Sequence, residues 1–191
     1  MCGIVGYIGN KEAYPIIING LKRLEYRGYD SAGFIVNAEK FVSEKTKGKV
    51  SDLEAKAAKD TIPTATFGMG HTRWATHGVP NDKNSHPHLS NSGKLAIVHN
   101  GIIENYQSIK QRLLQEGLKR CWQLYAAHIL LFIFFIAQIS WEAVRYALNE
   151  VVGAYAIAVM EEANPSKMVV ARLGSPLVIG IGENEFYIAS S

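Results

Sequence analysis

The feature that most constrains the fold is a set of short apolar segments in which polar residues do not alternate with apolar ones. Residues 3–8, 66–72 and 154–160 read GIVGYI, TFGMGHT and AYAIAVM. A strand that faces solvent on one side alternates apolar and polar residues, whereas a strand buried on both faces does not. These segments therefore predict strands covered on both faces, which requires further layers of structure around the sheet.

The order of the expected elements favours antiparallel sheets over a doubly wound parallel sheet. Strands and helices come in blocks, and several strand pairs are joined by connections of hairpin length. Further strands are expected at 31–36, 40–46, 94–99, 168–172, 177–180 and 186–189. Helices are expected around 13–24 and at 50–59, 105–116 and 141–151, with Ser51 and Asn105 as caps. The sequence therefore predicts an α+β fold in which two sheets pack face to face with helices outside.

Length, composition and charge are those of one globular domain. The 191 residues are 48% hydrophobic and 19% charged, which is enough apolar material for a buried core. The formal net charge is +3 and the basic residues are scattered, so no nucleic acid partner is expected. Two cysteines, Cys2 and Cys121, cannot form a disulfide framework, and the N-terminus lacks the basic start of a signal peptide. The expected location is a reducing compartment, the cytoplasm.

The stretch from Cys121 to Trp141 contains no Asp, Glu, Lys or Arg. A membrane-spanning helix needs about 20 mostly apolar residues. Gln123, His128 and Gln138 interrupt this stretch, so a buried helix is favoured over a membrane anchor.

Cys2 is the strongest candidate for a catalytic residue. Removal of Met1 would place its thiol and a new α-amine on one residue, which supplies a nucleophile together with a base. A thiol with a pKa of about 8.5 is mostly protonated at neutral pH, and an α-amine with a pKa of roughly 7.7–8.0 can accept that proton. The alternative is that Cys2 merely begins a buried strand.

Three polar motifs could complete a site for cysteine chemistry: YRGYDS at 26–31, HTRWATHG at 71–78 and VHNGIIEN at 98–105. Asn100-Gly101 in the third motif is a pair that favours tight turns. An Asn side chain beside an unhindered Gly N–H can also donate two hydrogen bonds to an oxyanion. The two interpretations are compatible, so both stay open.

The second motif contains residues suited to a substrate carboxylate. Arginine binds a carboxylate through two parallel hydrogen bonds, so Arg73 could hold the substrate, with Thr76 and His77 completing the pocket. Trp74 could cap a small-molecule site. The alternatives are a surface salt bridge for Arg73 and a place in the core for Trp74.

A metal site is a second hypothesis for the same region. Five of the six histidines lie between residues 71 and 99. They are His71, His77, His86, His88 and His99. A site of three histidines could hold a catalytic zinc ion, but the spacing matches no specific metal-binding signature. The cysteine hypothesis is therefore favoured.

Five segments together resemble the glutaminase domain of the glucosamine-6-phosphate synthase family, also called glutamine–fructose-6-phosphate aminotransferases (isomerizing). They are MCGIVGYI at 1–8, RLEYRGYDSAG at 23–33, HTRWATHG at 71–78, SHPH at 85–88 and VHNGIIEN at 98–105. The resemblance runs from Met1 to about Gly117 and again from about Glu142 to Ser190. It implies a class II glutamine amidotransferase with the four-layer αββα sandwich of N-terminal-nucleophile hydrolases.

The resemblance implies a catalytic role for three residues. Cys2 attacks the side-chain amide of L-glutamine after Met1 is removed, and its own amine acts as the base. The Asn100 side chain and the Gly101 N–H hold the oxyanion. A thioester forms, ammonia leaves and water releases glutamate. No metal or organic cofactor is implied.

The resemblance also implies a substrate-binding role for five residues. Arg73 binds the substrate carboxylate, with Thr76 and His77 beside it. Trp74 belongs to a loop that closes over glutamine, and Arg27 supports the closed site.

The sequence departs from the family at two places. The family continues beyond the position of Ser191 into two sugar-isomerase domains that bind fructose 6-phosphate, so residues 1–191 are expected to form the glutaminase domain alone. The family motif Ser-x-Thr-Asp-Thr-Glu-Val, whose Asp holds the substrate α-ammonium, is replaced within the atypical residues 118–141. No Asp or Glu lies between Glu116 and Glu142. A compensated frame shift explains this better than divergence does.

The expected function is hydrolysis of glutamine to supply ammonia for glucosamine-6-phosphate synthesis. The alternative is an impaired or vestigial fragment that keeps the fold but binds glutamine poorly. L-glutamine is the expected partner, fructose 6-phosphate is expected only through the isomerase domains, and a homodimer is compatible with the resemblance. Neither nucleic acid nor a membrane is expected.

Overall fold

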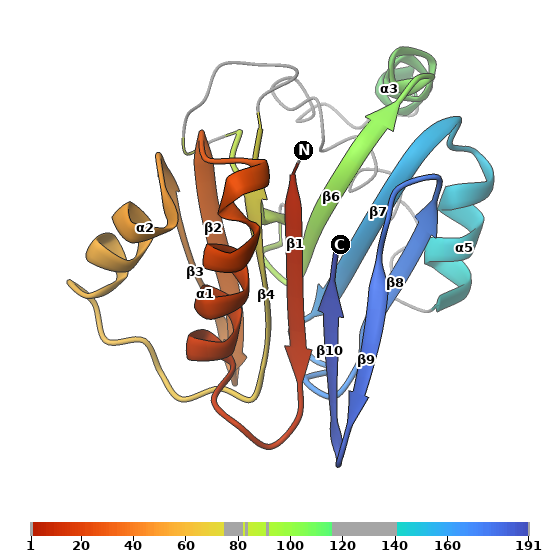
Figure 1. Ribbon diagram of the computed structural model, residues 1–191. Coiled ribbons are helices and arrows are strands. Elements are labelled where there is room, and N and C mark those ends of the chain that lie inside the picture. Colours follow the sequence, from red (N-terminus) through yellow and green to blue (C-terminus); the bar gives the residue numbers. More distant parts are fainter. Residues whose placement is uncertain (1, 75–81, 83, 91, 116–140, 191) are drawn as a thin grey trace.

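The computed structural model describes residues 2–74, 82, 84–90, 92–115 and 141–190, which form two antiparallel sheets with helices on their outer faces (Figure 1). The strands of the larger sheet are β1 (Gly3–Ile8), β2 (Ser31–Ala38), β3 (Lys40–Lys47), β4 (Phe67–Arg73), β9 (Val178–Gly182) and β10 (Glu185–Ala189). Their order in the sheet is β3-β2-β4-β1-β10-β9, and each neighbouring pair is antiparallel. The strand nearest the N-terminus therefore lies inside the sheet, between β4 and β10.

The smaller sheet has the order β5-β6-β7-β8 and is also antiparallel. Its strands are β5 (His88–Leu89), β6 (Leu95–Ile103), β7 (Gly153–Glu161) and β8 (Met168–Leu173). β6 is longer than the 94–99 segment expected from the sequence, because residues 100–103 continue to pair with β7. Asn100 lies opposite Ala156 and Gly101 lies opposite Tyr155. The interpretation of Asn100-Gly101 as a tight turn is therefore wrong.

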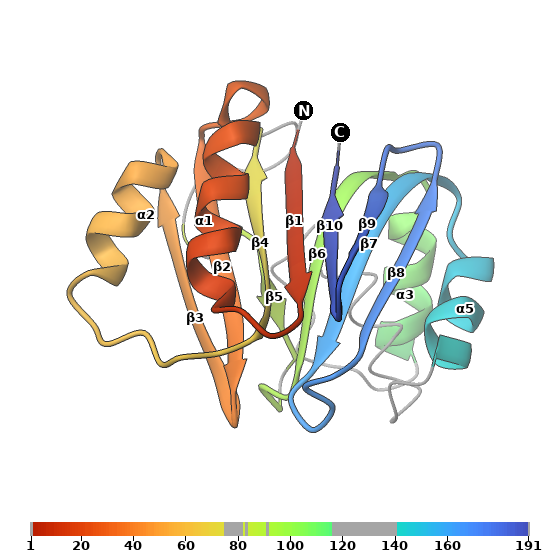
Figure 2. The same ribbon diagram turned by 60° about the horizontal axis from the view of Figure 1, so that its bottom comes forward.

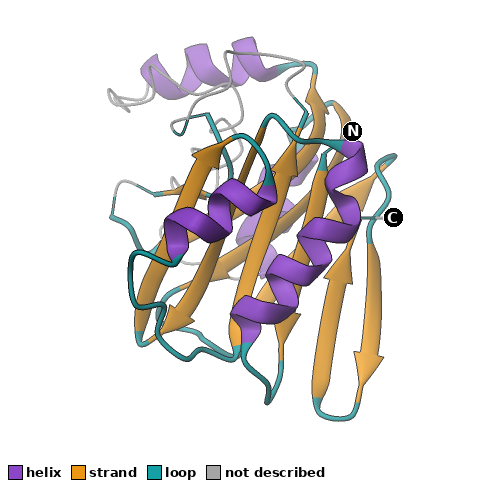
Figure 3. Cartoon of the chain, turned by 60° about the vertical axis from the view of Figure 1, so that its left-hand side comes forward, coloured by secondary structure: helices purple, strands orange, loops and turns teal. Residues whose placement is uncertain are grey.

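In the described part of the chain, two helices cover each sheet. The helices over the larger sheet are α1 (Ala13–Leu24) and α2 (Val50–Ala57), and those over the smaller sheet are α3 (Tyr106–Gln115) and α5 (Trp141–Asn149). Figure 2 shows the two pairs on opposite sides of the molecule, and Figure 3 looks onto the helices that cover the larger sheet. The predicted α+β sandwich with outer helices is confirmed.

Three apolar cores fill the three interfaces between these four layers. The central core joins Ile35, Phe67 and Met69 of the larger sheet to small side chains of the smaller sheet, such as Ala156 and Ala158. Two outer cores lie beneath the helices. Neighbouring residues of one strand belong to different cores, because successive side chains of a strand point to opposite faces.

This arrangement explains the apolar strands noted in the sequence. Ile4 lies in the central core whereas Val5 packs beneath α1 and α2, and Ala158 and Val159 divide in the same way between the central core and the core beneath α3 and α5. A strand between two cores has no face left for polar residues.

Of the two predicted helix caps, Ser51 is wrong, whereas Asn105 lies at the expected position with its side chain bonded elsewhere. α2 begins at Val50, and the Asp52 carboxylate accepts the Lys49 N–H at 2.8 Å, so Ser51 lies inside the helix. Asn105 immediately precedes α3, but its side chain donates to the Glu150 carbonyl at 2.7 Å and accepts the Val152 N–H at 2.9 Å. Its side chain thus ties the start of α3 to the chain that follows α5.

The apolar stretch from Cys121 to Trp141 lies outside the described residues except for Trp141, where α5 begins. Within the part of the chain that the structure describes, no helix combines the length and apolar character needed to cross a bilayer.

Candidate active site

Cys2 lies at the edge of the larger sheet where β1 begins and β4 ends. It directly precedes β1, and the antiparallel pairing of Gly3 with Thr72 places it opposite Arg73, the last residue of β4. The Trp74 N–H donates to the Cys2 sulfur at 3.4 Å, and the thiol donates to the Trp74 carbonyl at 3.8 Å. The register of β1 against β4 therefore positions the candidate nucleophile.

Burial raises the pKa of the Cys2 thiol, although the backbone N–H of Trp74 and the positive charge of Arg73 act in the opposite direction. A thiol with a raised pKa is almost entirely protonated at neutral pH. The thiolate is the nucleophilic form, so chemistry at this sulfur requires a nearby base.

Asn100, on β6 of the smaller sheet, contacts Cys2. Its side-chain nitrogen Nδ2 donates to the carbonyl oxygen of Cys2 at 3.1 Å, and its oxygen Oδ1 lies 2.9 Å from Nε2 of His71. His71 is on β4 and Asn100 is on β6, so these contacts span the interface between the sheets. An amide donor from one sheet thus lies beside the candidate nucleophile of the other.

Gly101 has an unusual backbone conformation within β6. Its φ angle is +110°, and a Cβ atom built there would lie 2.0 Å from the carbonyl oxygen of Ala154. Residues with a side chain avoid this conformation, so only glycine fits next to Asn100.

The predicted Arg27 lies on the same side of the site as Cys2. It belongs to the short helix η1 (Glu25–Arg27), is buried, and donates from Nη1 to the Ser190 carbonyl at 3.4 Å. The Ser190 hydroxyl accepts the N–H of Ile4 at 2.8 Å. Arg27 is therefore linked to the strand that carries Cys2 through the residue that follows β10.

Arg73 ends β4 immediately before Trp74 and is only 8% exposed, so the alternative of a surface salt bridge is wrong. Its carbonyl accepts the Asp30 N–H at 3.1 Å. Trp74 is 45% exposed and packs edge-on against Tyr29, with ring centroids 5.3 Å apart, so it is not a core residue. Thr76 and His77 lie outside the described residues.

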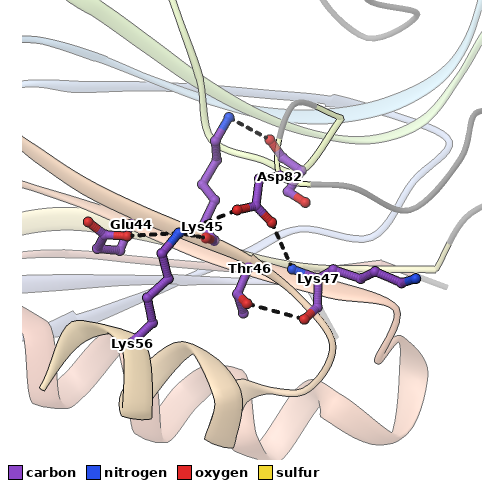
Figure 4. A network of polar contacts seen from close by, with 7 residues as sticks. Glu44, Lys45, Thr46, Lys47, Lys56 and Asp82 are labelled. Carbon is purple, nitrogen blue, oxygen red and sulfur yellow. Dashed lines mark hydrogen bonds and ion pairs between the residues drawn. The ribbon is translucent and has the colours of Figure 1, made fainter. Parts of the chain in front are cut away.

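The chain that follows this motif is tied to β3 and α2. The Asp82 carboxylate accepts the Lys47 N–H at 3.0 Å and lies 3.4 Å from the Lys56 ammonium (Figure 4). The Lys45 ammonium donates to the Ser85 carbonyl at 3.1 Å. These contacts fix the positions of Asp82 and Ser85, which follow residues 75–81 in the sequence.

The four described histidines, His71, His86, His88 and His99, form a buried neutral cluster. The ring centroid of His86 lies 4.3 Å from that of His71 and 4.3 Å from that of His88. Burial lowers the pKa of His71 and of His88 to about 3 and that of His99 to about 4, and it lowers the pKa of His86 well below its usual value. Among the described residues, no group of three His, Cys, Asp or Glu side chains is arranged to hold a metal ion.

Sequence reasoning missed two contributors to the site. The sequence singled out the side chain of Trp74, whereas its backbone N–H and carbonyl contact the Cys2 sulfur. Ser190 carried no motif, and only the pairing of β1 with β10 brings it to Ile4. The spacing of His71 and Arg73 on β4 did carry a signal, because residues two apart on a strand share a face.

Comparisons with known proteins show the family of the chain. The family profile described as "Glutamine amidotransferase domain" matches residues 56–191. The glutamine–fructose-6-phosphate aminotransferase (isomerizing) of Bacteroides thetaiotaomicron is 50% identical over 196 residues, covering 100% of this chain and 32% of that protein. The protein of the same name from Pyrococcus horikoshii is 45% identical over 194 residues, with the same coverage of 100% and 32%. The chain thus spans about a third of the length of these curated relatives.

Solved structures show the same fold. The glutamine phosphoribosylpyrophosphate amidotransferase of B. subtilis, in complex with ADP and GMP, superposes with a TM-score of 0.83 at 27% identity, covering 98% of this chain and 41% of that one. A glutamine aminotransferase class-II domain protein from Silicibacter pomeroyi has a TM-score of 0.65 at 11% identity over 99% of this chain and 88% of that one, a likeness of fold alone. The family profile covers most of the sequence, and the chain therefore belongs to the family of glutamine amidotransferase domains.

Proposed function

We propose that this chain is the glutaminase domain of a glutamine–fructose-6-phosphate aminotransferase and that it hydrolyses the side-chain amide of L-glutamine. The single observation that carries the proposal is the Asn100 amide nitrogen, 3.1 Å from the carbonyl oxygen of Cys2. It supports Asn100 as an oxyanion donor beside a cysteine that becomes N-terminal when Met1 is removed.

The first half of the reaction forms a thioester. The α-amine of Cys2 takes the thiol proton, and the sulfur attacks the amide carbon of glutamine. The negative charge that develops on the amide oxygen is stabilised by Nδ2 of Asn100 and the N–H of Gly101. The protonated amine then delivers its proton to the departing nitrogen, so ammonia leaves as the C–N bond breaks.

The second half regenerates the enzyme. Water attacks the thioester carbon, the C–S bond breaks, and the products are glutamate and the free thiol. The same two donors stabilise the second oxyanion. The net reaction consumes one glutamine and one water and releases one glutamate and one ammonia.

Substrate recognition in this proposal rests on the chain around Arg73. The Arg73 guanidinium binds the glutamine carboxylate, with Thr76 and His77 beside it. Trp74 closes over the bound substrate and Arg27 supports the closed site. The exposed indole of Trp74 next to the buried Arg73 supports this arrangement.

The wider biological role is also a proposal. The relatives named for fructose 6-phosphate are about three times as long as this chain, so the sugar reaction belongs to parts of those proteins that this chain does not match. Residues 1–191 would form the ammonia-supplying domain, in a homodimer or as a monomer. A catalytic thiol must stay reduced, which supports a cytoplasmic location.

The proposal is tested with purified protein whose N-terminus has been verified by mass spectrometry. We expect glutamate release from glutamine, and Cys2→Ala should lower kcat by roughly 1,000-fold or more. A glutamine-mimicking diazoketone should label Cys2 and inactivate the enzyme. Cys121→Ala, which removes the only other cysteine, should keep both activity and labelling.

Two results would contradict the proposal. One is full activity of Cys2→Ala, because the nucleophile would then lie elsewhere. The other is active protein that still carries Met1, because the base would then be missing. A folded protein that reacts with the diazoketone but never releases glutamate would instead support the alternative of an impaired fragment.

A further inference from the structure

Two oxygen atoms face one nitrogen of the His71 ring. Nε2 lies 2.9 Å from Oδ1 of Asn100 and 3.1 Å from the carbonyl oxygen of His99. A carbonyl oxygen can only accept a hydrogen bond, so Nε2 carries the ring proton. Nδ1 is buried and has no hydrogen-bond partner among the described residues, which fits an unprotonated nitrogen because a buried N–H without an acceptor is costly.

The Asn100 amide is fixed at both ends by this arrangement. Its oxygen faces the N–H of His71, and its nitrogen faces the carbonyl oxygen of Cys2. If the amide were rotated by 180°, its oxygen would face the Cys2 carbonyl and its nitrogen would face the N–H of His71. Both of those contacts are repulsive, so the two carbonyl groups of His99 and Cys2 together determine a single orientation.

We propose that His71 is a positioning residue that holds the Asn100 amide with its N–H group toward Cys2, where the oxyanion of the reaction forms. The inference rests on the proposed function and adds a residue to it. His71 acts through Asn100 and not on the substrate. A donor that is oriented before the reaction needs no reorganisation when charge develops, which is the condition for effective oxyanion stabilisation.

The state of the His71 ring supports this role. Burial lowers its pKa to about 3, so the ring is neutral and keeps the same proton across the physiological range. A neutral ring orients Asn100 without adding a positive charge that would disturb the amine of Cys2. The neighbouring His86 ring, with its centroid 4.3 Å away, packs against His71 and restrains its rotation.

Steady-state kinetics of glutamate release tests the role. His71→Leu removes the donor, and kcat should fall by about 10- to 100-fold with little change in KM, because the oriented N–H acts in the transition state. His71→Gln, whose terminal amide can place an N–H near the Nε2 position, should recover most of the loss. His88→Leu removes another buried histidine and should keep the wild-type kcat.

A double-mutant cycle separates positioning from general damage. Asn100→Ala alone should lower kcat by about 100- to 1,000-fold. If His71 acts through Asn100, adding His71→Leu to Asn100→Ala should cause no further loss. Losses that simply multiply in the double variant would overturn the inference.

The outcomes distinguish this inference from the proposed function. If His71→Leu keeps the wild-type kcat while Asn100→Ala loses most of it, the inference is contradicted and the proposed function still stands. Wild-type kcat in Asn100→Ala would contradict the proposed oxyanion site itself. Nitrogen NMR of the unaltered protein is independent of activity and of variant folding: it should show the His71 proton on Nε2 at neutral pH, and a proton on Nδ1 would refute the inference.

Discussion

At the scale of single residues, the candidate site depends on two neighbours with different requirements. Asn100 needs an orientation, which the His71 N–H and the Cys2 carbonyl supply. Gly101 needs the absence of a side chain, because its φ angle of +110° and the nearby Ala154 carbonyl leave no room for a Cβ atom. The Asn-Gly pair thus serves the backbone of β6 and the proposed oxyanion site together.

Gly101→Ala should both destabilise the protein and inactivate it. A non-glycine residue in this conformation costs on the order of 1–3 kcal/mol, and the contact with Ala154 adds to that cost. Urea unfolding should show the lower free energy of unfolding, and glutamate release should fall with it.

Gly180→Ala is the matched control for this substitution. Gly180 lies on β9, and its added Cβ would meet only the Tyr187 side chain at 3.6 Å and its carbonyl at 3.9 Å, both ordinary contacts. We expect a change within about 0.5 kcal/mol and unaltered activity. Equal stability of the two variants would contradict the conformational argument for Gly101.

At the scale of elements, a cluster of four buried histidines is built from several strands. β4 supplies His71, β5 and the residue pair before it supply His88 and His86, and β6 supplies His99. All four are buried and have lowered pKa values. The packing of these elements is therefore linked to the protonation of their histidines.

Acid should destabilise the protein at unusually mild pH. Unfolded histidines titrate near pH ~6.5, whereas folded His71 and His88 stay neutral down to about pH 3 and His99 down to about pH 4. Between these values the unfolded chain binds more protons, so the free energy of unfolding falls as pH falls, by up to about 1.4 kcal/mol per pH unit for each histidine. Above about pH 7 both states are neutral and the histidines contribute no slope.

Urea unfolding between pH 7.5 and 4.5 measures this slope. His88→Gln should reduce the slope of the free energy of unfolding against pH by the contribution of about one proton. The variant has one fewer group that becomes protonated only on unfolding. A stability that stays constant from pH 7 to pH 5 would show that the histidines are not held neutral by the fold.

Most of the elements could be predicted from the sequence, because hydrophobic periodicity is a local property of the chain. The strands, the helices of the described region and the two-sheet arrangement are confirmed, whereas Ser51, Asn105 and the Asn100-Gly101 turn were misjudged. Two of these errors involve a distant partner: Asn105 is bonded to residues 150 and 152, and Asn100-Gly101 is paired with β7. The Ser51 error is local, because α2 begins one residue earlier, at Val50. The motifs predicted the candidate site residues, but the contacts across the sheets could not be read from them.

At the scale of the whole molecule, the proposed substrate site is assembled from segments far apart in the sequence. Cys2 directly precedes β1, Arg73 ends β4 and Asn100 lies within β6. The group that would bind the substrate α-ammonium is expected within residues 118–141, which lie outside the described residues except for Trp141. That segment contains no acidic residue. The carboxylate and the amide of glutamine have candidate partners, whereas its ammonium group has none in this segment.

Glutamine should therefore bind weakly. A hydrogen bond to a charged group contributes roughly 1.5–3 kcal/mol, so loss of the family Asp should raise KM for glutamine by about 10- to 100-fold relative to the Bacteroides thetaiotaomicron protein. Glutaramate, which is glutamine without the α-amino group, is the matched substrate. This chain should hydrolyse both with similar kcat/KM, whereas the relative should strongly prefer glutamine. A strong preference for glutamine here would show that another group binds the ammonium.

The position of β1 has a consequence for how the protein folds during translation. β1 lies between β4 and β10, and the hydrogen-bonded Ile4 and Ser190 are 186 residues apart in the chain. During translation the first strand leaves the ribosome long before its second neighbour exists, so one edge of it stays unpaired until synthesis of the domain is nearly finished. Under the proposed function, that delay would leave the N-terminus accessible for removal of Met1 and would keep the Cys2 thiol inactive until β10 has paired with β1.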